Sequence, residues 1–197
     1  MTCAVLITPL VKDIPLFKDC DYIGVDAGAL KLLDAHIPMK MAVGDFDSMD
    51  PKDLNRISCP IERHPIMKNE TDSELAIRLC KDYDTIILYG GISGRLDHTI
   101  ANIRLAMYQY PNLVLMDEHQ KLTILRKGKY CLKNEYSHIS FYPIVEGTLT
   151  LQGFLYPLES RRIHMEEIYT TSNSLVEKEG TVIVEEGSFL CVQSNWR

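Results

Sequence analysis

Three groups of polar residues in this sequence combine carboxylates, cations and glycines at spacings that could do chemistry. The first is Gly-Asp-Phe-Asp-Ser at 44–48, which holds Asp45 and Asp47 two residues apart. Two ionised carboxylates about 5 Å apart repel by roughly 3 kcal/mol at an effective dielectric of 20, so a turn that brings them together favours a divalent cation. Mg²⁺ favours one or two carboxylates with phosphate oxygens and water. The alternative is turn and capping chemistry before a helix start at Asp50-Pro51.

The second group is Lys-Asn-Glu-Thr-Asp-Ser-Glu at 68–74. Thr71 and Glu74 have the spacing of a capping box, which predicts that a helix begins here. Capping does not account for Lys68 or Asp72. A lysine suits a phosphate, and a carboxylate in a first helical turn is favoured by the dipole and could complete a cation site. A solvated surface lysine is the common alternative.

The third group is Gly-Gly-Ile-Ser-Gly-Arg-Leu-Asp-His at 90–98, directly after an apolar run. Glycines such as Gly91 and Gly94 let the backbone approach an anion at a helix N-terminus. Arg95 adds bidentate donors suited to phosphate, and Asp97 adds a further carboxylate. The segment has neither the Gly-Lys-Ser/Thr of a Walker A loop nor a G-x-G-x-x-G fingerprint.

The elements that must position these groups alternate between short apolar runs and helical periodicity. This alternation predicts an α/β domain with a mostly parallel sheet over residues 1–118, because parallel strands are buried on both faces. Ligands bind beyond the carboxyl ends of such strands. Asp26 is expected at the same edge of the sheet, where it could contact a phosphate or only cap a helix. The expected strands are 4–7, 22–25, 41–43, 85–89 and 113–116, and the expected helices are 27–36, 71–83 and 96–109.

After residue 118 the helical period disappears. The remaining segments read as strands separated by Gly, Pro and Asn/Ser turns, which predicts a C-terminal all-β sandwich domain over 119–197. The two-residue gap at Glu186-Gly187 suggests a hairpin. The expected strands are 121–125, 138–142, 147–151, 181–186 and 188–193.

Composition excludes several classes of protein. With 197 residues, 46% hydrophobic and 24% charged, the chain is an ordinary globular protein of one or two domains. A net charge of −6 without a basic run argues against a nucleic-acid partner. The apolar runs are far shorter than the roughly 20 residues that span a bilayer, and no signal-type start is present, so we expect a cytoplasmic protein without a membrane partner. Six scattered cysteines, without zinc-site spacing, are expected to be reduced and mostly buried.

Taken in order, these groups resemble the thiamine pyrophosphokinase family over nearly the whole chain. The resemblance implies an α/β catalytic domain joined to a β-sandwich that binds thiamine, and a homodimer with composite active sites. It also implies transfer of a diphosphate from ATP to the thiamine hydroxyl, giving thiamine diphosphate and AMP. The matching segments are G-D-F-D-S at 44–48, K-x-x-T-D-x-E at 68–74, G-G-x-x-G-R-x-D-H at 90–98, and Ser172-Asn173.

Carried onto these residues, the resemblance implies that Asp45, Asp47 and Asp72 are Mg²⁺ ligands. Arg95 and Asp97 are then the pair that clamps phosphate and orients the alcohol, with Asp97 the candidate base. The expected contacts to ATP are Lys68, Gly91, Gly94, Arg95 and Asp26, and the expected catalytic residues are Asp97, Arg95 and Asp72.

For thiamine, the resemblance implies contacts from Ser172 and Asn173, and stacking on the pyrimidine by Tyr156 of the partner subunit. The sequence departs from the family pattern at two places. Asn69 stands where Asp is usual, which keeps an oxygen but loses a charge, and Val-Asp-Ala-Gly-Ala at 25–29 stands where D-G-G-A is common. Two alternative functions remain open: a pyrophosphokinase for another alcohol, such as a hydroxymethylpterin, and a thiamine-binding protein without catalysis.

Overall fold

The structure is a computed structural model that describes residues 1–47 and 49–195. Ser48, part of the first polar group, lies outside the described residues. The chain divides into two compact units, Met1–Glu118 and His119–Arg197. Within the described ranges, no helix is long and apolar enough to cross a membrane.

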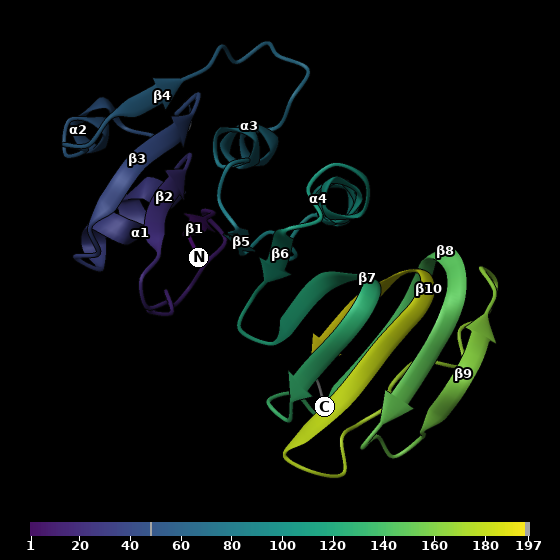
Figure 1. The fold of residues 1–197 in the computed structure, drawn as a ribbon. Helices are drawn as coiled ribbons and strands as arrows, with labels where there is room; N and C mark the ends of the chain where they lie inside the picture. The colour runs from purple at the N-terminus through teal and green to yellow at the C-terminus, as the bar shows by residue number, and fades with distance from the viewer. Residues whose placement is uncertain (48, 196–197) are drawn as a thin grey trace. The chain divides into compact units, whose positions relative to one another are not determined.

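The first unit is built on a parallel sheet in which every strand pair runs in the same direction (Figure 1). Its strand order is β4-β3-β2-β1-β5-β6. The short exposed strand β4 was not expected from the sequence, but the α/β fold class is confirmed. The strands are β1 (Cys3–Ile7), β2 (Asp21–Val25), β3 (Met39–Gly44), β4 (Ile61–Arg63), β5 (Thr85–Tyr89) and β6 (Leu113–Met116).

This order makes β1 the strand at which the direction of winding changes, because β2 and β5 lie on either side of it. Ligands bind at such a switch point in open α/β sheets. Gly90 follows β5 with a positive φ of 84°, and a Cβ added there would lie 2.3 Å from Oγ1 of Thr8, which follows β1. Glycine is therefore required for these two loops to meet.

Two of the helices in the described residues begin at a side-chain cap that the sequence indicates. The helices are α1 (Gly28–Asp34), α2 (Pro51–Leu54), α3 (Asp72–Leu79) and α4 (Leu96–Tyr108). Thr71 caps α3 by accepting a hydrogen bond from the Glu74 backbone at 3.1 Å, as the capping box predicts. Asp50 caps α2 by accepting a bond from the Lys52 backbone at 2.8 Å.

The buried face of α4 differs from the expected one. Helical periodicity predicts that Ile100, Ile103 and Met107 face the core, yet Ile100 is 50% exposed. The buried residues of this helix are Asn102, Leu105 and Ala106. Asn102 donates a hydrogen bond to the carbonyl of Gly91 at 2.7 Å, and this bond joins the buried face of α4 to the glycine turn.

The expectation that all cysteines are reduced is wrong for two of them. Cys3 and Cys20 form a disulfide, with their Cα atoms 4.6 Å apart. The pairing follows from register, because Ala4 lies opposite Asp21 in neighbouring strands and so brings the preceding cysteines together. Cys59, Cys80, Cys131 and Cys191 are free. Burial raises the pKa of the Cys80 and Cys191 thiols to about 12, so these two remain protonated.

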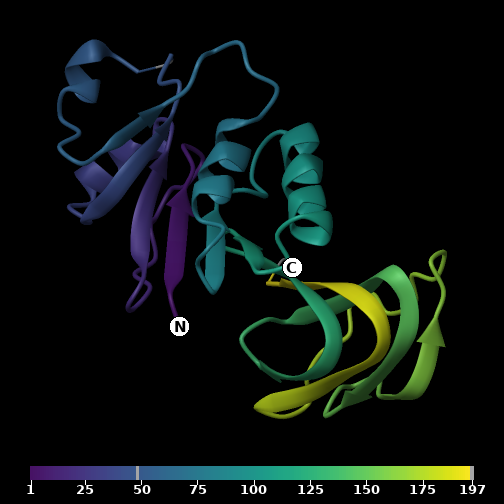
Figure 2. The same cartoon turned by 45° about the horizontal axis from the view of Figure 1, so that its top comes forward.

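The second unit is an antiparallel sheet of four strands in the order β7-β10-β8-β9. Figure 2 shows these strands curving strongly, and the core they enclose includes Phe141, Leu149, Val184 and Phe189. The C-terminal β prediction is therefore confirmed. The strands are β7 (Gln120–Lys133), β8 (His138–Gln152), β9 (Leu158–Ile163) and β10 (Glu179–Ser194).

The hairpin expected at Glu186-Gly187 is wrong, because β10 continues through these residues. Its register against both neighbouring strands shifts between Val184 and Ser188, which is a β-bulge. Gly187 has a φ of 75°, and a Cβ added there would lie 2.4 Å from the carbonyl oxygen of Glu146 on β8. Gly187 thus marks a bulge within a long strand. In the sequence, such a glycine looks the same as one in a turn between two strands.

Candidate active site

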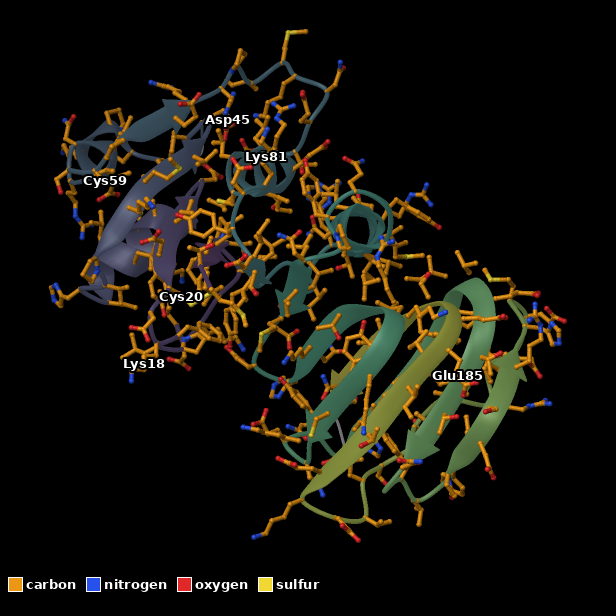
Figure 3. The ribbon with its side chains drawn as sticks, viewed as in Figure 1. Lys18, Cys20, Asp45, Cys59, Lys81 and Glu185 are labelled. Atoms are coloured by element: carbon orange, nitrogen blue, oxygen red, sulfur yellow. A yellow bond between two sulfur atoms is a disulfide. The ribbon has the colours of Figure 1, made fainter. Side chains whose placement is uncertain are left out.

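Two carboxylates are brought together by the ends of neighbouring strands β2 and β3. Asp26 follows β2, and its backbone N–H donates a hydrogen bond to the Val43 carbonyl at 2.8 Å. Asp45 follows β3, beyond its end and near α3 (Figure 3). Gly44 allows this close approach, because an added Cβ would lie 3.0 Å from the Asp26 Cα.

A lysine side chain joins this strand edge to the start of α3. The Nζ of Lys68 lies 2.7 Å from Oδ2 of Asp45 and 3.0 Å from Oδ1 of Asp72. The side chains of Lys68 and Asp45 are 11% exposed and that of Asp72 is 26% exposed. The three groups form a partly buried ion cluster, in which water screens the charges less than at an open surface.

The charges of this cluster act on one another. The hydrogen bond from Lys68 lowers the pKa of Asp45. Burial opposes the charged form of Lys68, but its contacts with Asp45 and Asp72 outweigh burial and raise its pKa. Burial raises the pKa of Asp26, and repulsion from Asp72, Asp45 and Asp47 adds to the effect. Asp26 is therefore close enough to the other three carboxylates for their charges to act on it.

Two buried carboxylate oxygens, one in this cluster and one on the neighbouring Asp26, have no hydrogen-bond partner among the described residues: Oδ1 of Asp72 and Oδ1 of Asp26. The Asp72 oxygen has only its ion pair with Lys68. In the described part of the chain, no three His, Cys, Asp or Glu side chains are close enough to hold a metal by themselves. Two carboxylates completed by phosphate oxygens and water nevertheless fit Mg²⁺, which rarely uses an all-protein cage.

The glycine turn presents a second polar pair at the N-terminus of α4. Arg95 donates to Asp97 through Nε at 3.1 Å and through Nη2 at 2.5 Å. This pairing lowers the pKa of Asp97 and keeps it ionised. The two side chains are 73% and 63% exposed, so they are free to exchange each other for a ligand.

The residues expected to contact ATP or its metal differ in how exposed they are. Gly91 is buried, and its carbonyl is held by Asn102 of α4, whereas Gly94 is exposed with a φ of 93°. Asp47 is exposed, and its backbone donates to Oδ1 of Asp45 at 3.3 Å. Asn102 was not singled out from the sequence. The available signal was an amide directly between Ala101 and Ile103, where a buried polar group needs a partner.

The two departures from the family pattern lie outside the ion cluster. Asn69 is exposed, whereas the neighbouring Lys68 is the residue that contacts Asp45 and Asp72. Ala27 has a φ of −62°, which any residue adopts, so a glycine is not required there. Gly28 is required instead, because an added Cβ would lie 2.0 Å from the carbonyl oxygen of Ile7.

In the β unit, the expected thiamine contacts are joined by hydrogen bonds. Oδ1 of Asn173 accepts from the Tyr156 backbone at 3.1 Å, and Nδ2 donates to the Tyr156 carbonyl at 2.8 Å. Asn173 is 5% exposed, while Tyr156 is 65% exposed. Ser172 is exposed with a positive φ of 59°. Asn173 therefore holds the backbone of a loop that presents an aromatic ring to solvent.

Replacing Asn173 by alanine tests this positioning role. We expect the free energy of unfolding of the β unit to fall by about 2–3 kcal/mol, because the Tyr156 backbone loses both partners. Denaturant unfolding measures this change, and the KM for thiamine is expected to rise more than the KM for ATP. Asn134→Ala is the matched control, since its amide donates to the Glu177 carbonyl at 2.9 Å in an exposed position. Equal changes in both variants would contradict the prediction.

An α/β unit whose strand ends gather carboxylates, a lysine and a glycine turn, followed by an all-β unit, is typical of enzymes that bind a polyphosphate. Comparison with known proteins specifies the class further. Residues 16–116 match the family described as thiamin pyrophosphokinase, catalytic domain. Residues 121–189 match thiamin pyrophosphokinase, vitamin B1 binding domain. The chain belongs to the thiamin pyrophosphokinase family.

Individual relatives agree with this result. The chain is 33% identical over 185 residues to thiamine pyrophosphokinase of Bacillus subtilis, covering 88% of this chain and 86% of the relative. A crystal structure of the Bacillus subtilis enzyme superposes with a TM-score of 0.87 at 29% identity, over 99% of each chain. A structure from Geobacillus thermodenitrificans gives 0.85 at 28%, over 100% and 98%. The resemblance is confirmed, and with it the expectation of an enzyme, a thiamine diphosphokinase.

Proposed function

We propose that this protein transfers a diphosphate group from ATP to the hydroxyl of thiamine, giving thiamine diphosphate and AMP, with Mg²⁺ bound. The observation that carries the proposal is the ion cluster of Asp45, Asp72 and Lys68. It lies at the strand ends of a unit that matches the catalytic family. Carboxylates and a cation at this edge suit a nucleotide triphosphate with its metal.

In the α/β unit, we assign Asp45 and Asp72 to the metal as the carboxylates that share Lys68, and Asp47 as a further ligand that would turn toward them when the metal binds. Oδ1 of Asp72 supports this assignment, because it is buried and already faces a cation, the Lys68 ammonium, at 3.0 Å. Bound Mg²⁺ would neutralise charge on the phosphate oxygens and reduce their repulsion of the nucleophile. We assign Asp26 to the same nucleotide, because it follows β2 at the strand edge where Gly44 and Asp45 lie.

We assign the phosphate clamp to Arg95, together with Lys68 and the backbone at Gly91 and Gly94. The thiamine oxygen would attack the β-phosphorus in line as the bond to the α-phosphate oxygen breaks, and AMP leaves. Arg95 holds the transferring group with its planar fork, so the protein contributes mainly positioning and charge. Asp97 orients the alcohol and accepts its proton late in the transfer, because its carboxylate lies beside Arg95 at the N-terminus of α4.

In the β unit, we assign thiamine binding to Ser172 and Asn173. Tyr156 of the partner subunit would stack on the pyrimidine in a homodimer with composite sites. Its 65% exposure supports this role, because a large ring open to solvent is available to a ligand. Ile168, at 73% exposure, adds apolar surface on the same unit that a second subunit could cover.

The test is purified protein with ATP, Mg²⁺ and thiamine, followed by chromatography for AMP and thiamine diphosphate. We expect both products in equal amounts and none without thiamine. Hydroxymethylpterin as the acceptor is the matched control and is expected to give no AMP. Thiamine binding without AMP would contradict the proposal in favour of a non-catalytic protein, and release of inorganic phosphate would contradict it in favour of a hydrolase.

A further inference from the structure

The Lys68 ammonium lies between two carboxylates that come from different elements. Asp45 follows β3 and Asp72 opens α3, and both oxygens contact the same nitrogen, at 2.7 and 3.0 Å. The separation of the two oxygens therefore cannot exceed the sum of these two distances. The ammonium therefore occupies the position from which a single cation would contact both carboxylates.

The position of Lys68 is unfavourable for a lysine in one respect. It precedes the N-terminus of α3, where the helix dipole disfavours positive charge and favours the carboxylate of Asp72. The two carboxylates must therefore hold the ammonium against the dipole. The loop that carries Lys68 extends between β4 and α3 without helix or strand over residues 64–71. Such a segment can move its side chain without breaking the sheet or the helix.

We propose that Lys68 is an exchangeable built-in cation, which neutralises Asp45 and Asp72 in the metal-free protein and is displaced when a divalent cation enters. This inference rests on the proposed function of the site. An ammonium and a divalent cation cannot contact the same two oxygens, because they would repel strongly at that separation. Once displaced, the charge of Lys68 becomes available to the phosphates that arrive with the metal.

The exchange has a consequence for the order of binding. In the absence of a nucleotide, an incoming metal must displace Lys68 without giving its ammonium a new anionic partner. Phosphate oxygens supply that partner, so the metal binds better together with the nucleotide than alone. Lys68 thus lowers the affinity of the free protein for the bare metal.

Titration of Mn²⁺ alone, in the absence of nucleotide, tests this exchange by calorimetry and by the EPR signal of free Mn²⁺. We expect Lys68→Met to bind Mn²⁺ at least tenfold more tightly than the parent protein. Lys68→Arg keeps a cation and is expected to remain within about threefold of the parent. Lys81→Met is the matched control, because Lys81 is an exposed lysine just after α3 (Figure 3) and its loss should leave Mn²⁺ binding unchanged.

Thermal unfolding provides a second measurement and reports whether each variant folds. In EDTA, Lys68→Met is expected to have a lower Tm than the parent, because Asp45 and Asp72 repel without a cation between them. Mg²⁺ should then raise its Tm by more than it raises that of the parent. A Lys81→Met protein should show neither difference.

The inference is overturned if Lys68→Met binds Mn²⁺ no more tightly than the parent, or if neither protein binds it. It is also overturned if Lys68→Arg gains affinity as Lys68→Met does, since the effect would then not depend on charge. Product formation is judged separately on the parent protein. A parent that makes no thiamine diphosphate contradicts the proposed function, whereas the Mn²⁺ titrations decide the exchange in either case.

Discussion

Asp72→Asn is expected to lower kcat by about two to three orders of magnitude, with a much smaller change in the KM for ATP. The amide has nearly the shape of the carboxylate, so α3 keeps its Thr71 cap and the fold is retained. The substitution removes the negative charge of Asp72. Its buried Oδ1 lies 3.0 Å from the Lys68 ammonium and accepts no hydrogen bond among the described residues. That charge is the one we assign to the metal during transfer.

The measurement is steady-state kinetics at saturating Mg²⁺, with the concentration of Mg²⁺ for half-maximal rate as a second readout. We expect this concentration to rise in Asp72→Asn. Asp82→Asn is the matched control, because it removes the same charge from an exposed position of the same unit and should retain the parent rate. A rate for Asp72→Asn within threefold of the parent would remove Asp72 from the site.

Arg95→Lys is expected to lower kcat by about three orders of magnitude although the charge is kept. Arg95 contacts Asp97 through two nitrogens of one planar fork, and the same geometry suits two oxygens of a phosphate. A lysine presents a single point charge and cannot reproduce this contact. Because the side chain is 73% exposed, the free energy of unfolding should change by less than about 0.5 kcal/mol.

Single-turnover kinetics with ATP and thiamine separate the transfer step from product release in this variant. Arg104→Lys is the matched control, since Arg104 lies on the same helix and packs over the Tyr108 ring, 5.2 Å from its centroid. Its replacement should leave the transfer rate near that of the parent. Equal losses in the two variants would mean that α4, and not the fork of Arg95, determines the rate.

The strands of the α/β unit could be predicted from the sequence because burial on both faces leaves continuous apolar runs. The ranges 85–89 and 113–116 agree with β5 and β6 to the residue. Strand β4 has only three residues, all exposed, and so leaves no apolar signal. In the β unit, the bulge at Gly187 looks like a turn in the sequence, because both features place a glycine at positive φ.

In the site too, features that follow from the strand order could be predicted, and features that depend on the path of a loop could not. The position of Asp26 and Asp45 at one sheet edge follows from parallel strands, which end on the same side. The placement of Lys68 between Asp45 and Asp72 could not be predicted, because it depends on the path of the irregular loop 64–71. The disulfide of Cys3 and Cys20 was missed for a related reason, since it depends on how β1 and β2 are aligned.

The central position of β1 also affects how the protein is made. One edge of β1 pairs with β2, and its other edge pairs with β5, which comes much later in the sequence. In this second pairing, Cys3 aligns with Thr85 and Ile7 with Tyr89. During synthesis, the nascent chain therefore carries an unpaired apolar strand edge until that segment has left the ribosome. Open edges of this kind can pair with other chains, so this interval exposes the polypeptide to aggregation.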